Sequence, residues 1–508
     1  MKIAGMKWAL AGFVFAALVA PARAQDLASF EKRITVKVLD NGLTVLVCER
    51  HEAPVFSFFT YVNVGADREV PGITGLAHMF EHMAFKGTET IGTTDYPAEK
   101  AALAKVEEAY GAYDRERRRE VGRDEKKVAE LEKAWKDAID RANKYVKPHE
   151  FDTIVEENGG VGMNAFTTNE ETGYFYAFPS NRLELWAYLE SDRFLHPVLR
   201  EFYKERDVVY EERRMRVDSE PNGRMFEQFA AAAFIAHPYG KPVVGWPSDL
   251  QHFSATDAKA FFDKYYVAPN LTVAVVGDVK TSDVLAVCEK YFGRLPKRPK
   301  PDALVTVEPS QNSEREVILH EAAQPLYIEG YHKPSASDTK NEPVFDALQD
   351  LMSNGRTSRL YRSLVRDKKI AAFAGGFNDF PGGKYPDLFV FFAVPTPGHT
   401  PEELRDAIHA EVKRLQSEDI TDEELNTMKT RVKADLLRTL GDNGGLASNL
   451  ATNQALLGDW RELFVEVDRI GKVSKDDIRR VANEYFVQSN RTEGMIETVP
   501  EAGSKGGK

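Results

Sequence analysis

Cysteine is scarce in this chain of 508 residues, which contains only Cys48 and Cys288. Two cysteines cannot build the dense disulfide framework of small secreted domains, so disulfide-stabilised folds are excluded. Both lie in apolar segments far apart in the sequence, and a chain of this length can be stable without crosslinks. We therefore predict two buried free thiols, with a disulfide between them as the alternative.

Positive charge is also in deficit. The chain has 67 Lys and Arg residues against 79 Asp and Glu residues, which gives a formal net charge of -12. Proteins that bind nucleic acid need a clustered basic face to neutralise phosphates, and the sequence has no such cluster. The composition therefore excludes nucleic acid as the main partner.

Long apolar runs do not occur after the first 24 residues, so no stable membrane span is predicted. Within those residues, two lysines precede an apolar stretch at 8–19, and small residues follow around Ala24. This pattern is typical of a signal peptide covering residues 1–24, with cleavage after Ala24. We therefore expect a periplasmic or secreted protein, with an uncleaved membrane anchor as the alternative.

The remaining chain contains an internal duplication. Residues 254–270 and 474–490 share a spacing that indicates a capped helix leading into a strand, at an offset of 220. Gly87 and Gly355 follow two other helical segments at an offset of 268, which is 48 more. The first copy is therefore expected to carry an insertion of about that length.

A charged segment at about 97–147 matches this insertion. It is dense in Ala, Glu, Lys and Arg, and its apolar residues recur at helical spacing with a break near Gly122. We predict two antiparallel helices that form a hairpin, pack mainly on each other and turn a solvated charged face outward.

Strand-like and helical segments follow one another in both copies, which predicts an α+β fold. We expect two homologous domains, at 25–295 and 313–498, each with an antiparallel-rich sheet backed by helices. A proline-rich polar stretch at 296–312 is the predicted linker between them, and residues 499–508 are the predicted disordered tail.

The motif HMFEH at 78–82 contains the candidate metal ligands and the candidate general base. His78 and His82 lie one turn apart on one face of a predicted helix, so both imidazoles can reach a single zinc ion. Glu81 lies beside them, where its carboxylate can take a proton from water as a general base. A pair of surface or capping histidines is the alternative.

A catalytic zinc site needs a third protein ligand, which in hydrolases is usually a carboxylate. The predicted helix at 201–216, EFYKERDVVYEERRMR, offers candidates. Glu205 and Glu212 are two turns apart on one face, whereas Glu211 points about 100° away from Glu212. On spacing alone, each of them could equally be an exposed ion-pairing residue.

These residues resemble the superfamily of pitrilysin, insulinase and the mitochondrial processing peptidase, whose members carry the motif HxxEH. Further matches include DNGLTVLVCERHEAP, ENGGVGMNAFTTNEETGYF, HPYGKPVVGWPSDL and NGRTSRLYRSLVRD, so the resemblance, to a two-domain bacterial member, covers nearly all of the mature chain. It implies one Zn²⁺ per chain, held by His78, His82 and Glu212. It also implies that Glu205 orients a ligating imidazole.

The resemblance also indicates where substrate binds. Asn164, Ala165 and Phe166 match an edge strand that holds extended peptide through main-chain hydrogen bonds. A turn role for Asn164 is the alternative. Arg366 matches the first member of an Arg and Tyr pair that contacts substrate near the metal, but the second position is Phe373, which has no hydroxyl.

The second half departs from the motif. Its equivalents of the three motif positions are Asp346, Gln349 and Asp350, none of which offers an imidazole. The resemblance therefore implies a single zinc site in the chain.

The activity implied is that of a zinc metalloendopeptidase, which hydrolyses unfolded peptides or oligopeptides by metal-activated water with Glu81 as general base. A non-catalytic binding or assembly subunit on the same scaffold is the alternative. Because Phe373 lacks a hydroxyl, we expect a heterodimer with a paralogue that lacks HxxEH, or a homodimer.

Overall fold

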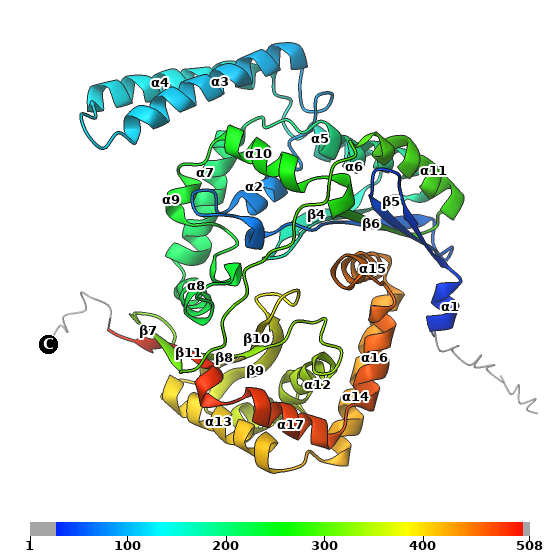
Figure 1. Ribbon diagram of the computed structural model, residues 1–508, viewed down its shortest axis with the longest axis vertical. Helices are drawn as coiled ribbons and strands as arrows, with labels where there is room; N and C mark the ends of the chain where they lie inside the picture. Colours follow the sequence, from blue (N-terminus) through cyan, green and yellow to red (C-terminus); the bar gives the residue numbers. More distant parts are fainter. Residues whose placement is uncertain (1–26, 501–508) are drawn as a thin grey trace, which may run out of the picture.

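The computed structural model describes residues 27–500. The predicted signal peptide, 1–24, and all but the first two residues of the predicted disordered tail lie outside the described residues. The described chain forms two units that face each other, each with one sheet backed by helices (Figure 1). The predicted α+β fold of two homologous domains is confirmed.

The first sheet has six strands in the order β1-β2-β6-β3-β5-β4. Their bounds are β1 Ile34–Val38, β2 Thr44–Glu49, β6 Leu271–Gly277, β3 Val55–Val62, β5 Thr172–Pro179 and β4 Val161–Thr167. Strands β2 and β6 are parallel, and every other neighbouring pair is antiparallel. Strand β6 is apolar and buried along its whole length, as a central strand must be, whereas β4 forms one edge.

Helices of the first unit cover one face of this sheet (Figure 1). The unit contains α1 Leu27–Glu31, α2 Leu76–Met83, α5 Glu150–Glu157, α6 Leu183–Leu195, α7 Phe202–Arg213, α9 Pro247–Leu250, α10 Ala255–Tyr265 and α11 Thr281–Tyr291. The fully buried Trp186 of α6 packs edge-on against Phe56 of β3, with ring centroids 6.0 Å apart. The main hydrophobic core lies between this face and the helices.

The second sheet repeats the plan in the order β7-β11-β8-β10-β9, which corresponds to β2-β6-β3-β5-β4. Its strands are β7 Arg315–Glu321, β11 Arg491–Thr498, β8 Leu326–Lys333, β10 Asp387–Pro395 and β9 Ala371–Phe380, and its helices are α12 Glu342–Ser353, α13 Pro401–Ser417, α14 Asp422–Gly441, α16 Glu462–Lys472 and α17 Lys475–Tyr485. Strands β7 and β11 are parallel, as β2 and β6 are. The two copies therefore share their topology.

The duplicated segments also share their hydrogen bonds. In each copy a capping box starts the helix, and an Asn side chain donates to the carbonyl of the Tyr near its end. The equivalent residues are Ser254 with Asp257 and Ser474 with Asp477, and Asn270 with Tyr265 (2.9 Å) and Asn490 with Tyr485 (3.0 Å). The two copies therefore share the residues that cap the start of this helix and those that form hydrogen bonds at its end.

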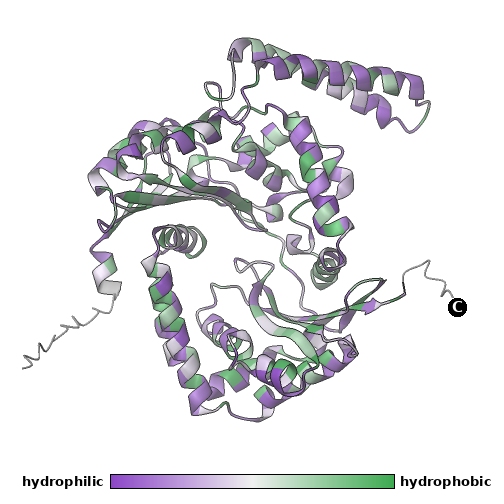
Figure 2. Cartoon of the chain, turned by 180° about the vertical axis from the view of Figure 1, so that it is seen from behind, coloured by the Kyte–Doolittle hydropathy of each residue, from purple (hydrophilic) through white to green (hydrophobic). Residues whose placement is uncertain are grey.

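The two units exchange one helix each. Helix α8, Pro221–Ala233, leaves the first unit and buries Phe229 against the second sheet. Helix α15, Asn443–Leu457, leaves the second unit and buries Leu450 against the first sheet. Figure 2 shows the first sheet in hydrophobic green between its own helices and α15. The segment 296–312 therefore connects the two copies in sequence, but each copy also contributes a helix to the hydrophobic core of the other.

The inserted segment forms a hairpin of α3 Tyr96–Arg117 and α4 Glu125–Ala142, which projects at the top of Figure 1. Its base belongs to the main core, through the buried residues Val106, Tyr110, Trp135, Ala138 and Ala142. The two helices pack mainly on each other, as expected, but the base of the hairpin is also part of the main core. Aromatic side chains on both helices meet α7, and Trp135 packs edge-on against Tyr203 with ring centroids 5.1 Å apart.

Cys48 and Cys288 are both buried and free, as predicted. Among residues 27–500, no helix has the length and apolar character needed to cross a lipid bilayer.

Candidate metal centre

Helix α2 presents the motif HMFEH. The helix starts after Gly75, whose φ of 94° is left-handed, and a Cβ there would lie 2.8 Å from the Val244 carbonyl oxygen. The Glu69 carboxylate accepts hydrogen bonds from the backbone N–H groups of Gly75 (2.8 Å) and Ala77 (2.7 Å). An acceptor at a helix start satisfies N–H groups that have no partner within the helix. The start of α2 is thus fixed, and the helix lies against α7.

Three side chains converge between α2 and α7. The Glu212 Oε2 atom lies 3.6 Å from Nε2 of His78 and 3.2 Å from Nε2 of His82. Tetrahedral zinc ligands at about 2.0–2.1 Å from the metal lie roughly 3.3–3.4 Å apart, so these separations suit one ion. Burial lowers the pKa of His78 to about 4, which keeps its imidazole in the neutral form that binds metals. The donor set of two imidazoles and one carboxylate fits zinc.

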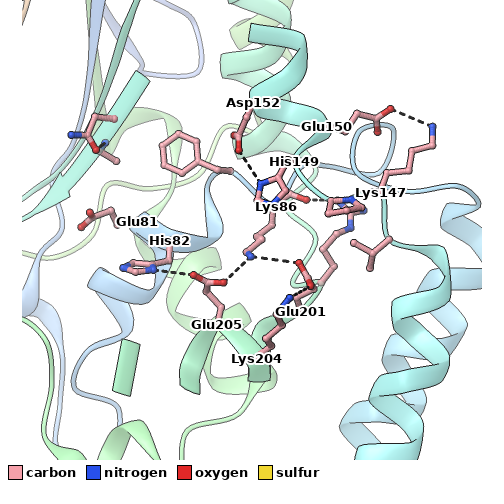
Figure 3. Close-up of a pocket in the computed structure, with 16 residues that line it drawn as sticks. Glu81, His82, Lys86, Lys147, His149, Glu150, Asp152, Glu201, Lys204 and Glu205 are labelled. Atoms are coloured by element: carbon pink, nitrogen blue, oxygen red, sulfur yellow. Dashed lines mark hydrogen bonds and ion pairs between the residues drawn. The ribbon is translucent and has the colours of Figure 1, made fainter. Parts of the chain in front are cut away.

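A chain of charged groups orients His82 (Figure 3). Its Nδ1 donates to Oε1 of Glu205 (3.0 Å), and the Lys86 ammonium lies 2.7 Å from Oε2 of the same carboxylate and 3.5 Å from Glu201. Burial acts against ionisation of Glu205, but these hydrogen bonds lower its pKa to about 2. Burial acts against protonation of His82, but its hydrogen bonds to Glu205 and Glu212 raise its pKa to about 9. Glu205 keeps the proton on Nδ1, so a bound metal ion would replace the proton on Nε2, which faces Glu212. Lys86 was not predicted, although its place four residues after His82 was a signal.

Glu81 lies beside the three converging groups. Its Oε2 is 4.0 Å from Nε2 of His78, and the side chain is 20% exposed. Burial raises the pKa of the Glu81 carboxyl. A carboxylate with increased proton affinity, within reach of both solvent and the converging ligands, has the properties of a general base.

The two adjacent glutamates of α7 have different surroundings. Glu211 is exposed and pairs with Arg214 at 2.9 Å. Glu212 is mostly buried, and its second oxygen, Oε1, is 2.9 Å from Arg216. The helical phase inferred from the sequence therefore agrees with the structure, which brings Glu212 and not Glu211 to the histidines.

Edge strand β4 borders a hollow of about 350 Å³ beside the motif. Asn164 and Ala165 line this hollow together with Glu81 and His82 (Figure 3). Phe166 points to the other face of the sheet, where its ring lies 5.9 Å from that of Phe59. Ala165 and Phe166 are adjacent on the strand and point to opposite faces of the sheet, so Phe166 does not face the hollow.

The second-unit candidates are not brought to this site. Arg366 is exposed, and its guanidinium binds the neighbouring Asp367 at 2.6 and 2.9 Å. Phe373 of β9 is 44% exposed and stacks on Phe377, with ring centroids 6.3 Å apart. Neither Arg366 nor Phe373 lines the hollows that contain Glu81.

The second-unit equivalents of the HMFEH motif, Asp346, Gln349 and Asp350, accept hydrogen bonds from other residues of the chain. Asn378 donates from Nδ2 to Asp346 (2.9 Å) and from its backbone N–H to Gln349 (2.6 Å). Asp350 accepts from Asn354 (2.7 Å) and Arg431 (3.4 Å). These positions therefore take part in a local hydrogen-bond network of the second unit.

A second histidine and carboxylate group, which the sequence did not suggest, lies between β8, β11 and α13. Glu329, His409 and Glu493 offer atoms within 4.8 Å of one another. The Arg491 guanidinium already lies 2.8 Å from both His409 and Glu493. A fixed cation therefore stands among these carboxylates, and the group is an ion-pair network. The pairing of Glu329 with Glu493 across β8 and β11 became visible only with the strand register.

Two family models match the chain. Residues 44–115 and 138–246 match the family model described as insulinase (peptidase family M16), and residues 252–432 match the M16 inactive domain. The stretch between the first two matches, 116–137, lies in the α3–α4 hairpin.

Relatives match over most of their length. The zinc protease PqqE of Helicobacter pylori is 29% identical, covering 95% of this chain and 96% of that protein. The mitochondrial-processing peptidase subunit beta of Lentinula edodes is 24% identical, covering 89% and 87%.

Solved structures show the same fold. A protease from Helicobacter pylori has a TM-score of 0.77 at 27% identity and covers 91% of this chain and 99% of that one. The periplasmic protease PqqL from Escherichia coli has a TM-score of 0.68 at 16% identity, covering 92% of this chain and 48% of that one. Together with the family models, which span both halves, these matches show that the chain belongs to the insulinase family of peptidases, family M16.

Proposed function

We propose that the protein is a zinc metalloendopeptidase that hydrolyses unfolded peptides. The observation that carries the proposal is the convergence of His78 Nε2, His82 Nε2 and Glu212 Oε2 beside Glu81. Three protein ligands and an accessible side are typical of catalytic zinc, whereas structural zinc sites are closed by four. Relatives named as zinc proteases support the same activity.

Zinc bound by these residues would supply Lewis acidity, which acidifies water and polarises a peptide carbonyl. The chain's own part begins at Glu81, whose carboxylate takes a proton from the attacking water and returns it to the leaving amine. Glu205 keeps His82 in the tautomer that presents Nε2, and Lys86 holds Glu205 in place.

Strand β4 supports an extended substrate. It is an edge strand, so its outer N–H and C=O groups are free of sheet partners, and Asn164 on it is exposed. A peptide added as a further strand would be held by main-chain hydrogen bonds that do not depend on its sequence. Such binding requires an unfolded segment.

We also propose that the protein acts in the periplasm or is secreted, since residues 1–24 have the signal-peptide pattern and one structural neighbour is a periplasmic protease. A heterodimer with a paralogue that lacks HxxEH, or a homodimer, remains part of the proposal.

Metal removal tests the activity. Protein loaded with zinc should contain one equivalent by elemental analysis and cleave an unstructured peptide. Treatment with a chelator should abolish cleavage, and added Zn²⁺ should restore it. Cleavage that persists in metal-free protein, or failure to bind zinc, would contradict the proposed function.

A further inference from the structure

A second and larger hollow, of about 1160 Å³, also contains the catalytic groups but has no residue of strand β4 in its lining. Glu81, His82 and Glu212 line it on one side. Tyr113 and Ile139 of the α3–α4 hairpin line it on the other. The hairpin therefore forms one wall of a groove that begins at the catalytic groups.

The hairpin wall is fixed to the helix that carries Glu212. Arg206 of α7 is buried, and its guanidinium carbon lies 4.9–5.9 Å from the ring centroids of Tyr110, Trp135 and Tyr203. Its Nη1 donates to the Tyr110 hydroxyl at 2.9 Å. Tyr113 stacks on Trp135 with ring centroids 5.4 Å apart and planes 12° apart. Because these contacts join both helices to α7, the groove has a preformed shape.

The charged side chains of the groove are paired with one another. Four of the basic groups have an acidic neighbour: Arg117 with Asp114 (2.6 Å), Lys136 with Glu132 (2.5 Å), Lys204 with Glu201 (2.7 Å) and Arg216 with Glu212 (2.9 Å). The fifth, Arg206, donates to the Tyr110 hydroxyl and the Phe253 carbonyl. Glu211 is paired with Arg214. Burial raises the pKa of Asp207 against the nearby charges of Arg206 and Lys136. The groove therefore presents little unpaired charge of either sign to a ligand.

Two apolar side chains on either side of Glu212 are exposed to solvent in the groove. Val208 and Met215 lie one helical turn before and after Glu212 and are 45% and 68% exposed. Tyr113 and Ile139 stand on the opposite wall and are half-buried. Exposed apolar groups on both walls of a groove mark a binding site more specifically than single surface residues do.

We propose that this groove is a specificity subsite, which takes an aromatic or large aliphatic side chain of the peptide substrate between Val208 and Met215 on one wall and Tyr113 and Ile139 on the other. The occupant is the substrate because the catalytic groups line the same groove. The inference rests on the proposed function and adds a side-chain preference to it. Tyr113 and Ile139 belong to the α3–α4 hairpin, so the hairpin takes part in the proposed preference.

Cleavage-site mapping tests the subsite. Zinc-loaded wild type, Val208→Glu and Met215→Glu digest the same unfolded protein, and mass spectrometry identifies the residues around each cut. Wild type should enrich aromatic or large aliphatic residues at one position near the cut. Each variant should cleave such sites about tenfold more slowly, the scale of a lost apolar pocket contact. Val305→Glu, at an 86% exposed linker position, is the matched control and should keep the wild-type pattern. An unchanged pattern in both groove variants overturns the subsite.

A binding measurement separates the subsite from catalysis. Two unstructured peptides that differ only by Phe or Glu at one position are titrated into zinc-loaded Glu81→Gln protein, with and without Met215→Glu. The Phe peptide should bind about tenfold more tightly, and Met215→Glu should remove the difference. Equal affinities in Glu81→Gln protein overturn the subsite. A preference for Phe without any hydrolysis by wild type would support the subsite and refute the proposed peptidase.

Discussion

Glu81 is the residue of the HMFEH motif whose loss separates metal binding from chemistry. It lies 4.0 Å from His78 but is not one of the three converging ligands. Glu81→Gln should therefore keep zinc and lose peptide hydrolysis by at least about a hundredfold, the usual contribution of a general base. Elemental analysis and initial rates on the same sample measure both properties. Near-normal turnover of the zinc-loaded variant would refute the role.

The two neighbouring glutamates of α7 provide a matched pair of substitutions. Glu212 faces both histidines, whereas Glu211 is exposed and binds Arg214. Glu212→Gln should weaken zinc binding markedly, because an ionised carboxylate ligand is lost from a site with three protein ligands. Glu211→Gln should bind zinc like wild type. Titration with a chelator of known affinity compares the two variants, and a larger loss with Glu211→Gln would contradict the assignment.

At the scale of elements, the α3–α4 hairpin has a core-forming base and an exposed end. Complete replacement of 97–147 by a Gly/Ser linker removes Tyr110 and Trp135 from the main core. Loss of one large aromatic core side chain typically costs about 3–5 kcal/mol, and a whole domain is stable by only about 5–15 kcal/mol. We therefore expect insoluble or metal-free protein, contrary to the tolerance that a self-packed hairpin would have.

A shorter deletion serves as the control for this prediction. Replacing 114–131 by a tight turn keeps Tyr110, Tyr113 and Trp135, which join the hairpin to α7 and to the core. This trimmed protein should fold and bind zinc like the full chain, as judged by thermal unfolding and elemental analysis. A folded, zinc-binding product of the complete deletion would show that the buried base is dispensable.

At the scale of the whole molecule, Phe373 bears on whether the chain works with a second subunit. Phe373 replaces an expected Tyr and is 44% exposed, so it does not simply fill the core. A missing donor to a developing oxyanion typically costs about 10²–10³ in rate. The lone chain should therefore cleave unstructured peptides poorly. Because Phe373 does not line the hollows that contain Glu81, Phe373→Tyr should leave kcat/KM nearly unchanged, and we expect the missing donor to come from a partner.

Light scattering and activity after mixing test the assembly directly. A paralogue that lacks HxxEH but keeps the Arg and Tyr pair should bind the chain and raise its activity. Full activity of the wild-type chain alone, unaffected by such a paralogue, would remove the heterodimer from the proposal and leave a monomer or homodimer.

Local spacing sufficed for features that depend on one helix or on one repeat. A separation of four residues places His78 and His82 on one face of any α-helix, and seven residues do the same for Glu205 and Glu212. The capping boxes and the offsets between the copies likewise require only local rules. The repeated units and the pairing of His78 with His82 were predictable for this reason, whereas the choice of Glu212 as the third ligand came from the family resemblance.

Other features depend on contacts between distant segments, which no local rule specifies. Helices α8 and α15 cross to the opposite unit because their apolar faces find a sheet there, and nothing in their periodicity says which sheet. In the sequence, Trp135 is one of several apolar residues in a charged segment, and nothing local indicates that it packs on Tyr203 of α7. The sequence by itself determined the repeated α+β units and the helical faces that carry His78, His82 and Glu212. Only the tertiary structure decided that His82 is the imidazole that Glu205 orients, that Lys86 binds Glu205 and that the hairpin forms a wall of the groove. Burial and side-chain contact are properties of the packed chain.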